Sequence, residues 1–250
     1  MDYQTSLKRL NTLRGQIKYT ADSVAARNSA TLSVAVARKA IWSYIKPEVF
    51  EVFEAWSELE DVQLVSKYVE STEQQRIDST RIFVQLVNKL FEKGYTSPKK
   101  IADNIDLFVT ACETVHAFDP AVATRFMTHY SLYCKTIKNL GTEKHTKLLL
   151  DATAMKHIGS YSLTELGHGS NVRGMETTAV YDPENQEFII NSPTDTSIKF
   201  WIGALGKVCN HTIVNAQLIT KGKNYGVHAF VCQVRDTEDH MPLEGLEIGD

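Results

Sequence analysis

Long apolar runs are absent from this 250-residue chain, and none approaches the roughly 18 apolar residues that a membrane-spanning helix requires. An excess of basic residues is also absent, because 27 lysines and arginines face 30 acidic residues. The basic residues are dispersed, without the clustered patch that is typical of nucleic-acid-binding proteins. We therefore expect no membrane span and no nucleic-acid partner.

Metal-binding spacings are missing as well. The chain has four cysteines and eight histidines, but no C-x-x-C pair and no H-E-x-x-H sequence. We expect no metal site, and reduced thiols in an intracellular compartment. A dinucleotide fingerprint is also lacking, since Gly167 and Gly169 are followed by Val172 where G-x-G-x-x-G needs its third glycine.

The chain does contain two contrasting halves. In residues 1–158, apolar residues recur at spacings compatible with about 3.6 residues per turn, which predicts helices. Asp119 and Thr142 are placed to cap two of them. The predicted helices span residues 23–44, 48–71, 73–93, 102–118, 120–140 and 143–155.

Residues 159–250 are rich in residues that favour strands. Strands at 177–181 and 187–191 flank a turn-rich segment and predict one hairpin. Strands at 211–220 and 226–234 predict a second, and residues 235–250 resemble a loop. Helices followed by strands predict an α+β fold, with a helical domain at 1–158 and a β domain at 159–250.

Two segments in the second half point to a ligand. The loop at 161–171 places Thr164, Ser170 and two glycines together, so backbone N–H groups and hydroxyls can approach a polar planar ligand or a phosphate. Trp201, followed by Ile202-Gly203, can present a flat face to a flat ligand. The alternatives are a glycine-rich crossover between domains and a tryptophan of the core.

A family resemblance weighs against those alternatives. The run L-T-E-L-G-H-G-S-N-V-R-G-M-E-T-T at 163–178 resembles the signature of the acyl-CoA oxidases, relatives of the acyl-CoA dehydrogenases. Further similar segments are Tyr181-Asp182-Pro183, Asn191-Ser192-Pro193, Leu205-Gly206-Lys207 and the run at 225–230. The similarity is dense over 159–250 and weaker over the helical half.

The resemblance implies the wider architecture. In that family an all-α N-terminal domain precedes an antiparallel β-barrel-like domain and C-terminal helical domains, and FAD lies between the last two, usually in a homodimer. This chain then carries the helical domain and a partial β domain, and the C-terminal helical domains are absent from it.

The resemblance also implies residue roles. Thr164 matches the threonine that hydrogen-bonds the flavin edge, and Gly169 and Ser170 match contacts on the phosphate side. Glu165 is expected to be structural rather than an acid or base. The full set of expected FAD-binding residues is Tyr161, Ser162, Leu163, Thr164, Gly169, Ser170, Trp201 and Gly203.

The implied reaction is the α,β-dehydrogenation of a fatty acyl-CoA to the trans-2-enoyl-CoA, with O₂ reduced to H₂O₂, in fatty-acid β-oxidation in the peroxisomal matrix. The family's base is a glutamate expected beyond Asp250, so no catalytic residue is assigned in this chain. Two departures keep alternatives open: Leu163 replaces a common glutamine, and Trp201-Ile202-Gly203-Ala204 replaces Trp-Pro-Gly-Gly. These alternatives are an acyl-CoA dehydrogenase and a non-catalytic oxidase-like subunit.

We expect the 250-residue chain, expressed alone, to give no H₂O₂ with an acyl-CoA, because the glutamate base is not among its residues. A peroxidase-coupled assay for H₂O₂ measures this. Flavin absorbance after purification distinguishes a chain that binds the cofactor from one that does not. Turnover by the chain alone would refute this expectation.

Overall fold

The computed structural model describes residues 71–92, 100 and 105–249. The predicted helix at 23–44, and all but the last residue of that at 48–71, lie outside the described residues. The described residues all belong to one compact unit, Glu51–Asp250.

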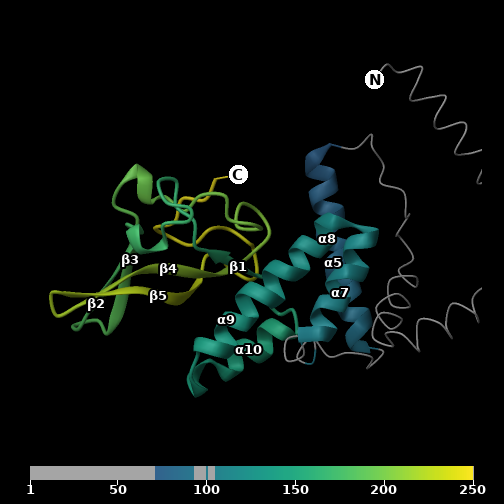
Figure 1. The fold of residues 1–250 in the computed structure, drawn as a ribbon, viewed down its shortest axis with the longest axis horizontal. Coiled ribbons are helices and arrows are strands. Elements are labelled where there is room, and N and C mark those ends of the chain that lie inside the picture. The colour runs from purple at the N-terminus through teal and green to yellow at the C-terminus, as the bar shows by residue number, and fades with distance from the viewer. Residues whose placement is uncertain (1–70, 93–99, 101–104, 250) are drawn as a thin grey trace, which may run out of the picture. The chain divides into compact units, whose positions relative to one another are not determined.

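Helices make up the first part of this unit (Figure 1). They are α5 (Thr72–Glu92), α7 (Ile105–Phe118), α8 (Pro120–Phe126), η1 (Met127–Cys134), α9 (Lys135–Leu140), η2 (Glu143–His145) and α10 (Thr146–Thr153). The predictions for 73–93, 102–118, 120–140 and 143–155 are confirmed within a few residues at each end. The run from α8 to α9 is continuous, and its middle eight residues, η1, form a π-helix.

The predicted cap at Asp119 is confirmed. Its carboxylate accepts from the N–H groups of Ala121 at 2.8 Å and Val122 at 3.2 Å, and Pro120 occupies the first turn, where no N–H is needed. Thr142 also precedes a helical turn, and its N–H donates to Nδ1 of His145 at 3.0 Å. None of the described helices is both long and apolar enough to cross a membrane.

Five strands form one sheet: β1 (Gly159–Ser162), β2 (Thr178–Asp182), β3 (Glu187–Asn191), β4 (His211–Thr220) and β5 (Lys223–Gln233). Both predicted hairpins are confirmed, because β2–β3 and β4–β5 pair antiparallel. The expectation of an antiparallel β domain is therefore confirmed for the two hairpins but wrong for the pairs that join β4 to β1 and β2. β1 and β2 each pair parallel with β4, so the sheet is mixed. Hairpin signals are local, whereas parallel pairs join strands across long connections.

Aromatic side chains show that the sheet curls. The ring of Phe188 in β3 lies 5.1 Å from that of Phe230 in β5, measured between centroids, although β2 and β4 lie between these strands. Tyr181, opposite Phe188 in the β2–β3 hairpin, completes the cluster at 5.2 Å. Curvature of this kind brings the two outer strands together over one face of the sheet.

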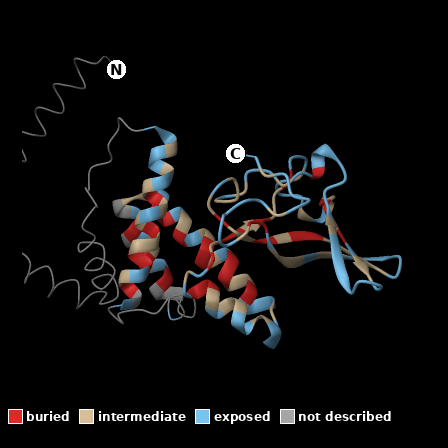
Figure 2. Cartoon of the chain, turned by 180° about the vertical axis from the view of Figure 1, so that it is seen from behind, coloured by how far each residue is buried: buried red, intermediate tan, exposed pale blue. Residues whose placement is uncertain are grey.

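The helices and the sheet share one apolar core, seen as red bands on both in Figure 2. Phe83, Phe126 and Tyr133 from the helices and Ile213 from β4 are at most 1% exposed. Tyr161, Ala229 and Val231 pack on the same core, which identifies the face of the sheet that meets the helices. Burial of this apolar surface is the main force that holds helices and sheet together.

His129 joins the π-helix to the sheet. Its Nε2–H donates to the carbonyl of Ala152 at 3.0 Å, and its Nδ1 accepts the N–H of Gly159, the first residue of β1, at 3.0 Å. Only the neutral ring with its proton on Nε2 satisfies both bonds. Gly159 is needed here because a Cβ at this position would overlap the ring of Tyr133.

Burial lowers the pKa of His129 to about 4, with the nearby His157 adding to this effect and the Ala152 bond opposing it. A folded-state pKa below the unfolded value of about 6.5 means that stability is complete above pH 6.5 and falls as the pH drops toward 4. We expect protonation of His129 alone to lower the free energy of unfolding by roughly 3 kcal/mol over that pH range. Urea unfolding at several pH values measures the loss. His129→Gln should be less stable at pH 7 and less sensitive to acid, and equal slopes for both proteins would contradict the assignment.

Candidate functional site

The two segments singled out in the sequence lie side by side. Residues 163–167 run antiparallel to residues 196–200, with Phe200 N–H donating to Thr164 O at 3.0 Å and Gly167 N–H to Thr196 O at 2.8 Å. A Cβ on Gly167 would lie 2.8 Å from that of Thr196, so the close approach requires glycine. Thr164 is therefore hydrogen-bonded to the residue that directly precedes Trp201.

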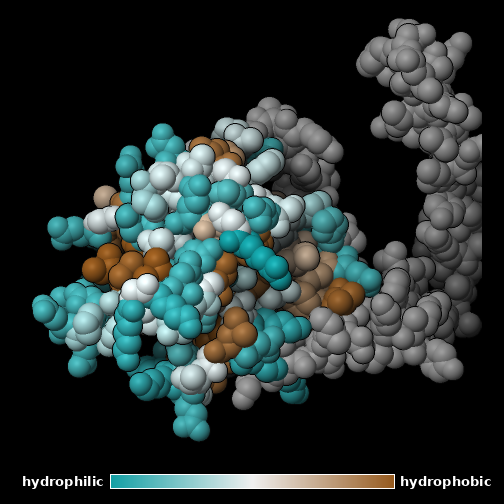
Figure 3. All heavy atoms as spheres, turned by 60° about the vertical axis from the view of Figure 1, so that its left-hand side comes forward, coloured by the Kyte–Doolittle hydropathy of each residue, from teal (hydrophilic) through white to brown (hydrophobic). Residues whose placement is uncertain are grey.

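At Trp201 the backbone turns out of this short ladder. Trp201 has φ +62° and Ala204 has φ +69°, both in the left-handed region that disfavours side chains with a Cβ. Trp201 is 90% exposed and Phe200 is 49% exposed, so Trp201 is not a core tryptophan. Apolar side chains also reach the surface as brown patches in Figure 3. An exposed aromatic pair on a sharp bend suits a flat ligand.

The polar groups beside this bend are available to a ligand. Within the described ranges, neither the N–H nor the hydroxyl of Thr164 has a hydrogen-bond partner, and the Ser170 hydroxyl has none either. Gly169 is exposed, with open space around the position of a Cβ, and a Cβ on Gly203 would meet only Thr128 Oγ1 of η1, at 3.7 Å. These residues present donors without competing contacts.

Two of the expected residues turn their side chains elsewhere. Tyr161 packs against the helical core, and the Ser162 hydroxyl lies 2.8 Å from that of Thr212 in β4. Both belong to β1, which ends directly before Leu163. Only their backbone remains to face a ligand beside Thr164.

Glu165 has a structural role in this arrangement. Its side chain is fully buried and accepts the N–H groups of Glu176 and Thr177, both at 2.8 Å, while Lys199 Nζ lies 3.2 Å away. Burial raises the pKa of the carboxyl, but these donors outweigh it and hold the pKa below its usual value. A carboxylate committed in this way is not free to take a substrate proton.

Lys199 is the cationic partner, and the sequence reasoning assigned it no role. Its Nζ donates to the carbonyls of Asn215 in β4 at 2.7 Å and Leu163 at 3.2 Å, in addition to Glu165. Burial lowers the pKa of Lys199, and Glu165 opposes the effect. The sequence does contain a signal for this role, since Lys199 is the one charged residue in the apolar run at 198–202. A charge between apolar residues usually has a buried partner.

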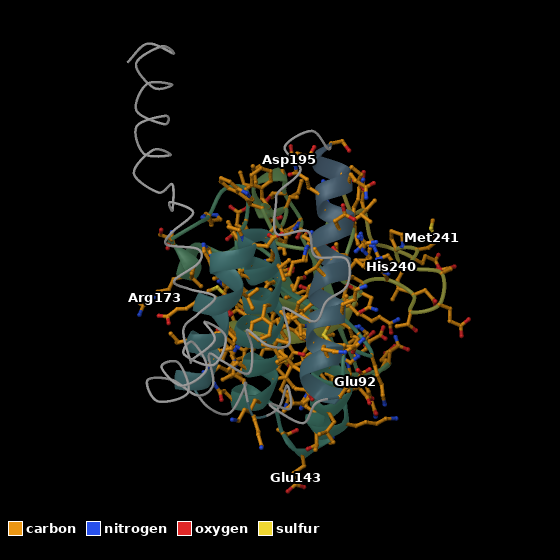
Figure 4. All side chains as sticks on the ribbon, turned by 90° about the vertical axis from the view of Figure 1, so that its right-hand side faces the viewer. Glu92, Glu143, Arg173, Asp195, His240 and Met241 are labelled. Atoms are coloured by element: carbon orange, nitrogen blue, oxygen red, sulfur yellow. The ribbon has the colours of Figure 1, made fainter. Side chains whose placement is uncertain are left out.

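A second carboxylate, that of Glu176, joins the loop at 163–178 to the segment at 194–196. Glu176 accepts the hydroxyls of Thr194 and Thr196, both at 2.6 Å, and lies 3.3 Å from His168 Nε2. The two hydroxyls and His168 lower the pKa of Glu176 to about 2. Arg173 of the same loop is exposed and points away from the ribbon (Figure 4).

Arg235 holds the turn behind Trp201. Its guanidinium is buried and donates to the carbonyls of Leu205, Gly206 and Cys209, each at 2.7 Å. Arginine suits this position because its planar donors reach several acceptors at once. Sequence reasoning also passed over this residue. Among the residues that the structure describes, no group of three or more His, Cys, Asp or Glu is placed to hold a metal ion.

Curated relatives of the chain are peroxisomal acyl-CoA oxidases. Human peroxisomal acyl-coenzyme A oxidase 1 is 46% identical over 166 residues, which is 66% of this chain and 24% of the relative. The putative peroxisomal acyl-coenzyme A oxidase 1.2 of Arabidopsis thaliana is 52% identical over 123 residues, or 49% of this chain and 18% of the relative. The alignments thus span about a quarter of these relatives or less. No family profile matches the sequence.

Solved structures give the same picture. Acyl-CoA oxidase-2 of Caenorhabditis elegans, solved with FAD, ascaroside-CoA and ATP, is 32% identical with a TM-score of 0.70, covering 92% of this chain and 34% of that one. Acyl-CoA oxidase 1 of Yarrowia lipolytica is 30% identical with a TM-score of 0.64, covering 82% and 30%. Helices followed by a mixed sheet agree with the fold of these oxidases.

The strained bend generates a stability prediction. Glycine removes the Cβ penalty of a left-handed residue, so Ala204→Gly should raise the free energy of unfolding by about 1 kcal/mol. Ala154 is the matched control, because its φ of −87° suits alanine and Ala154→Gly should lower stability by about 0.5–1 kcal/mol. Urea unfolding measures both, and losses of similar size for the two variants would refute the assigned strain.

Proposed function

Because the chain belongs to the acyl-CoA oxidase family, we propose that it supplies a helical domain and a β domain, at 1–158 and 159–250, of an FAD-dependent acyl-CoA oxidase of peroxisomal fatty-acid β-oxidation. The proposed reaction converts a fatty acyl-CoA to the trans-2-enoyl-CoA, with O₂ as the electron acceptor and H₂O₂ as the second product. Bound FAD supplies the electron-transfer chemistry, and the protein binds and orients. The whole enzyme is proposed to act as a homodimer.

The observation that carries the proposal is the pairing of an exposed aromatic bend with unpartnered donors. Trp201 offers a flat apolar surface, and Thr164, on the adjacent segment, offers an N–H and a hydroxyl that have no partner among the described residues. A flavin ring needs this combination, because its faces are apolar and its edge carries hydrogen-bond acceptors.

Each residue then has a proposed role. Thr164, whose N–H belongs to the Leu163–Thr164 peptide, binds the flavin edge, while Trp201 and Gly203 lie against the ring. Gly169 and Ser170 contact the phosphate side. Tyr161 and Ser162 contribute through their backbone.

The base that removes the α-proton is proposed to be the family's glutamate, expected beyond Asp250, and the two carboxylates nearest the candidate site do not suit this role. Glu165 is buried and shared among two N–H groups and Lys199, and Glu176 is held by two threonine hydroxyls. A general base must be able to gain a proton near working pH, and both carboxylates have lowered pKa values.

Thr164→Val tests the cofactor role. The variant loses the hydroxyl with little change of shape, and we expect FAD affinity to fall about tenfold, equivalent to about 1.4 kcal/mol. Titration of the apoprotein followed by flavin absorbance and fluorescence measures this. Thr220→Val, at the far end of β4, is the matched control and should bind as the unmodified protein does.

Turnover of the whole enzyme that contains this chain tests the reaction type. Peroxide formation from a saturated acyl-CoA in air, compared with reduction of an artificial acceptor under nitrogen, separates oxidase from dehydrogenase. Absence of bound flavin in the unmodified protein would refute the proposal.

A further inference from the structure

Lys199 carries a buried positive charge directly behind the proposed flavin-binding loop. Its side chain is 11% exposed, and its Nζ has four neighbours. They are the carbonyl oxygens of Asn215 at 2.7 Å and Leu163 at 3.2 Å, a carboxylate oxygen of Glu165 at 3.2 Å and the sulfur of Met175 at 3.4 Å. Two of these four neighbours are backbone carbonyls.

The Leu163 carbonyl belongs to the same peptide group as the Thr164 N–H. One end of this peptide therefore accepts from an ammonium group, while the other end has no partner within the described residues. The ladder with 196–200 stops at this point, because Phe200 donates to Thr164 O and the chain then turns away at Trp201. A cation on the carbonyl polarises the peptide and makes its N–H a stronger donor.

We propose that Lys199 is a positioning residue that acts through the Leu163–Thr164 peptide to favour the reduced, electron-rich form of the bound flavin. The inference rests on the proposed function, because it needs FAD beside Thr164. Donors fixed before reaction stabilise charge that develops during it, and a polarised N–H does so more strongly than an ordinary one. Lys199 itself need not touch the cofactor.

Glu165 limits the effect of this charge without cancelling it. Its carboxylate is shared with the N–H groups of Glu176 and Thr177, both at 2.8 Å, whereas the Lys199 ammonium contacts the Leu163 carbonyl directly. The positive charge of Lys199 raises the midpoint potential of the flavin, and the negative charge of Glu165 lowers it. Removing Glu165's charge should favour reduced flavin, and removing both charges should disfavour it.

Three variants of the FAD-loaded protein test this sign reversal. Glu165→Gln leaves the lysine charge, the double variant Lys199→Met/Glu165→Gln removes both charges without stranding a buried carboxylate, and Lys199→Arg keeps the pair. The readout is the midpoint potential of the bound flavin, measured at fixed pH by equilibration with a reference dye. Thermal unfolding and FAD titration accompany each measurement.

We expect the double variant to lower the ratio of reduced to oxidised flavin about tenfold, which lowers the midpoint potential by about 30 mV for a two-electron couple. Glu165→Gln should shift it upward, and Lys199→Arg should stay near the unmodified protein. Lys199→Met/Glu165→Gln and Glu165→Gln each test the sign separately, so failure of one variant to fold leaves the other decisive. A merely structural role would lower flavin affinity without opposite shifts in potential.

Lys156→Met is the matched control. Lys156 also pairs with a carboxylate, Asp151, at 2.6 Å, but on an exposed surface of the helical part. Its removal should leave the flavin potential unchanged. Unchanged potentials in both Glu165 variants, or a shift of equal size in the control, would overturn the inference while the proposed function stands. An unmodified protein without flavin would instead overturn the proposed function.

Discussion

The geometry of the candidate site depends on one buried ion pair, that of Glu165 and Lys199. Exposed pairs contribute little to stability, and a buried pair is tolerated only when its remaining donors and acceptors are satisfied. Here they are satisfied by the backbone, since the carboxylate accepts two N–H groups and the ammonium reaches two carbonyls. The pair thus holds the loop at 163–178, the segment at 196–200 and β4 together.

A second constraint positions the sheet against the helices. His129 lies in the π-helix and bonds both the end of α10 and the start of β1, while Gly159 admits the ring of Tyr133. π-Helical segments occur often at functional positions. Here the segment places His129 toward β1 and Thr128 toward Gly203, so one irregular stretch orients the sheet and borders the candidate site.

Local signals in the sequence predicted local structure well. The helix at 73–93, the cap at Asp119 and both hairpins follow from patterns within about 20 residues of each other, and the structure confirms them. The parallel pairing of β1 and β2 with β4 left no such pattern, because it joins distant strands. Thr164 and Trp201 were grouped as FAD contacts only through a family resemblance, and the structure places them on adjacent segments, since Phe200 N–H donates to Thr164 O. Lys199, Arg235 and His129 were missed, since each acts through contacts with backbone groups far away in the sequence.

The mixed sheet has a consequence for synthesis of the protein. Among the described strands β1 pairs with β4 alone, and Gly159 is registered with His211, 52 positions later in the chain. At ribosomal rates of roughly 5–20 residues per second, β1 waits about 3–10 s for its partner to be made. The described helices, which precede β1 in the chain, can pack together during this interval, but β1 keeps an unpaired edge until β4 is made, and an unpaired strand edge is open to misassembly or chaperone capture.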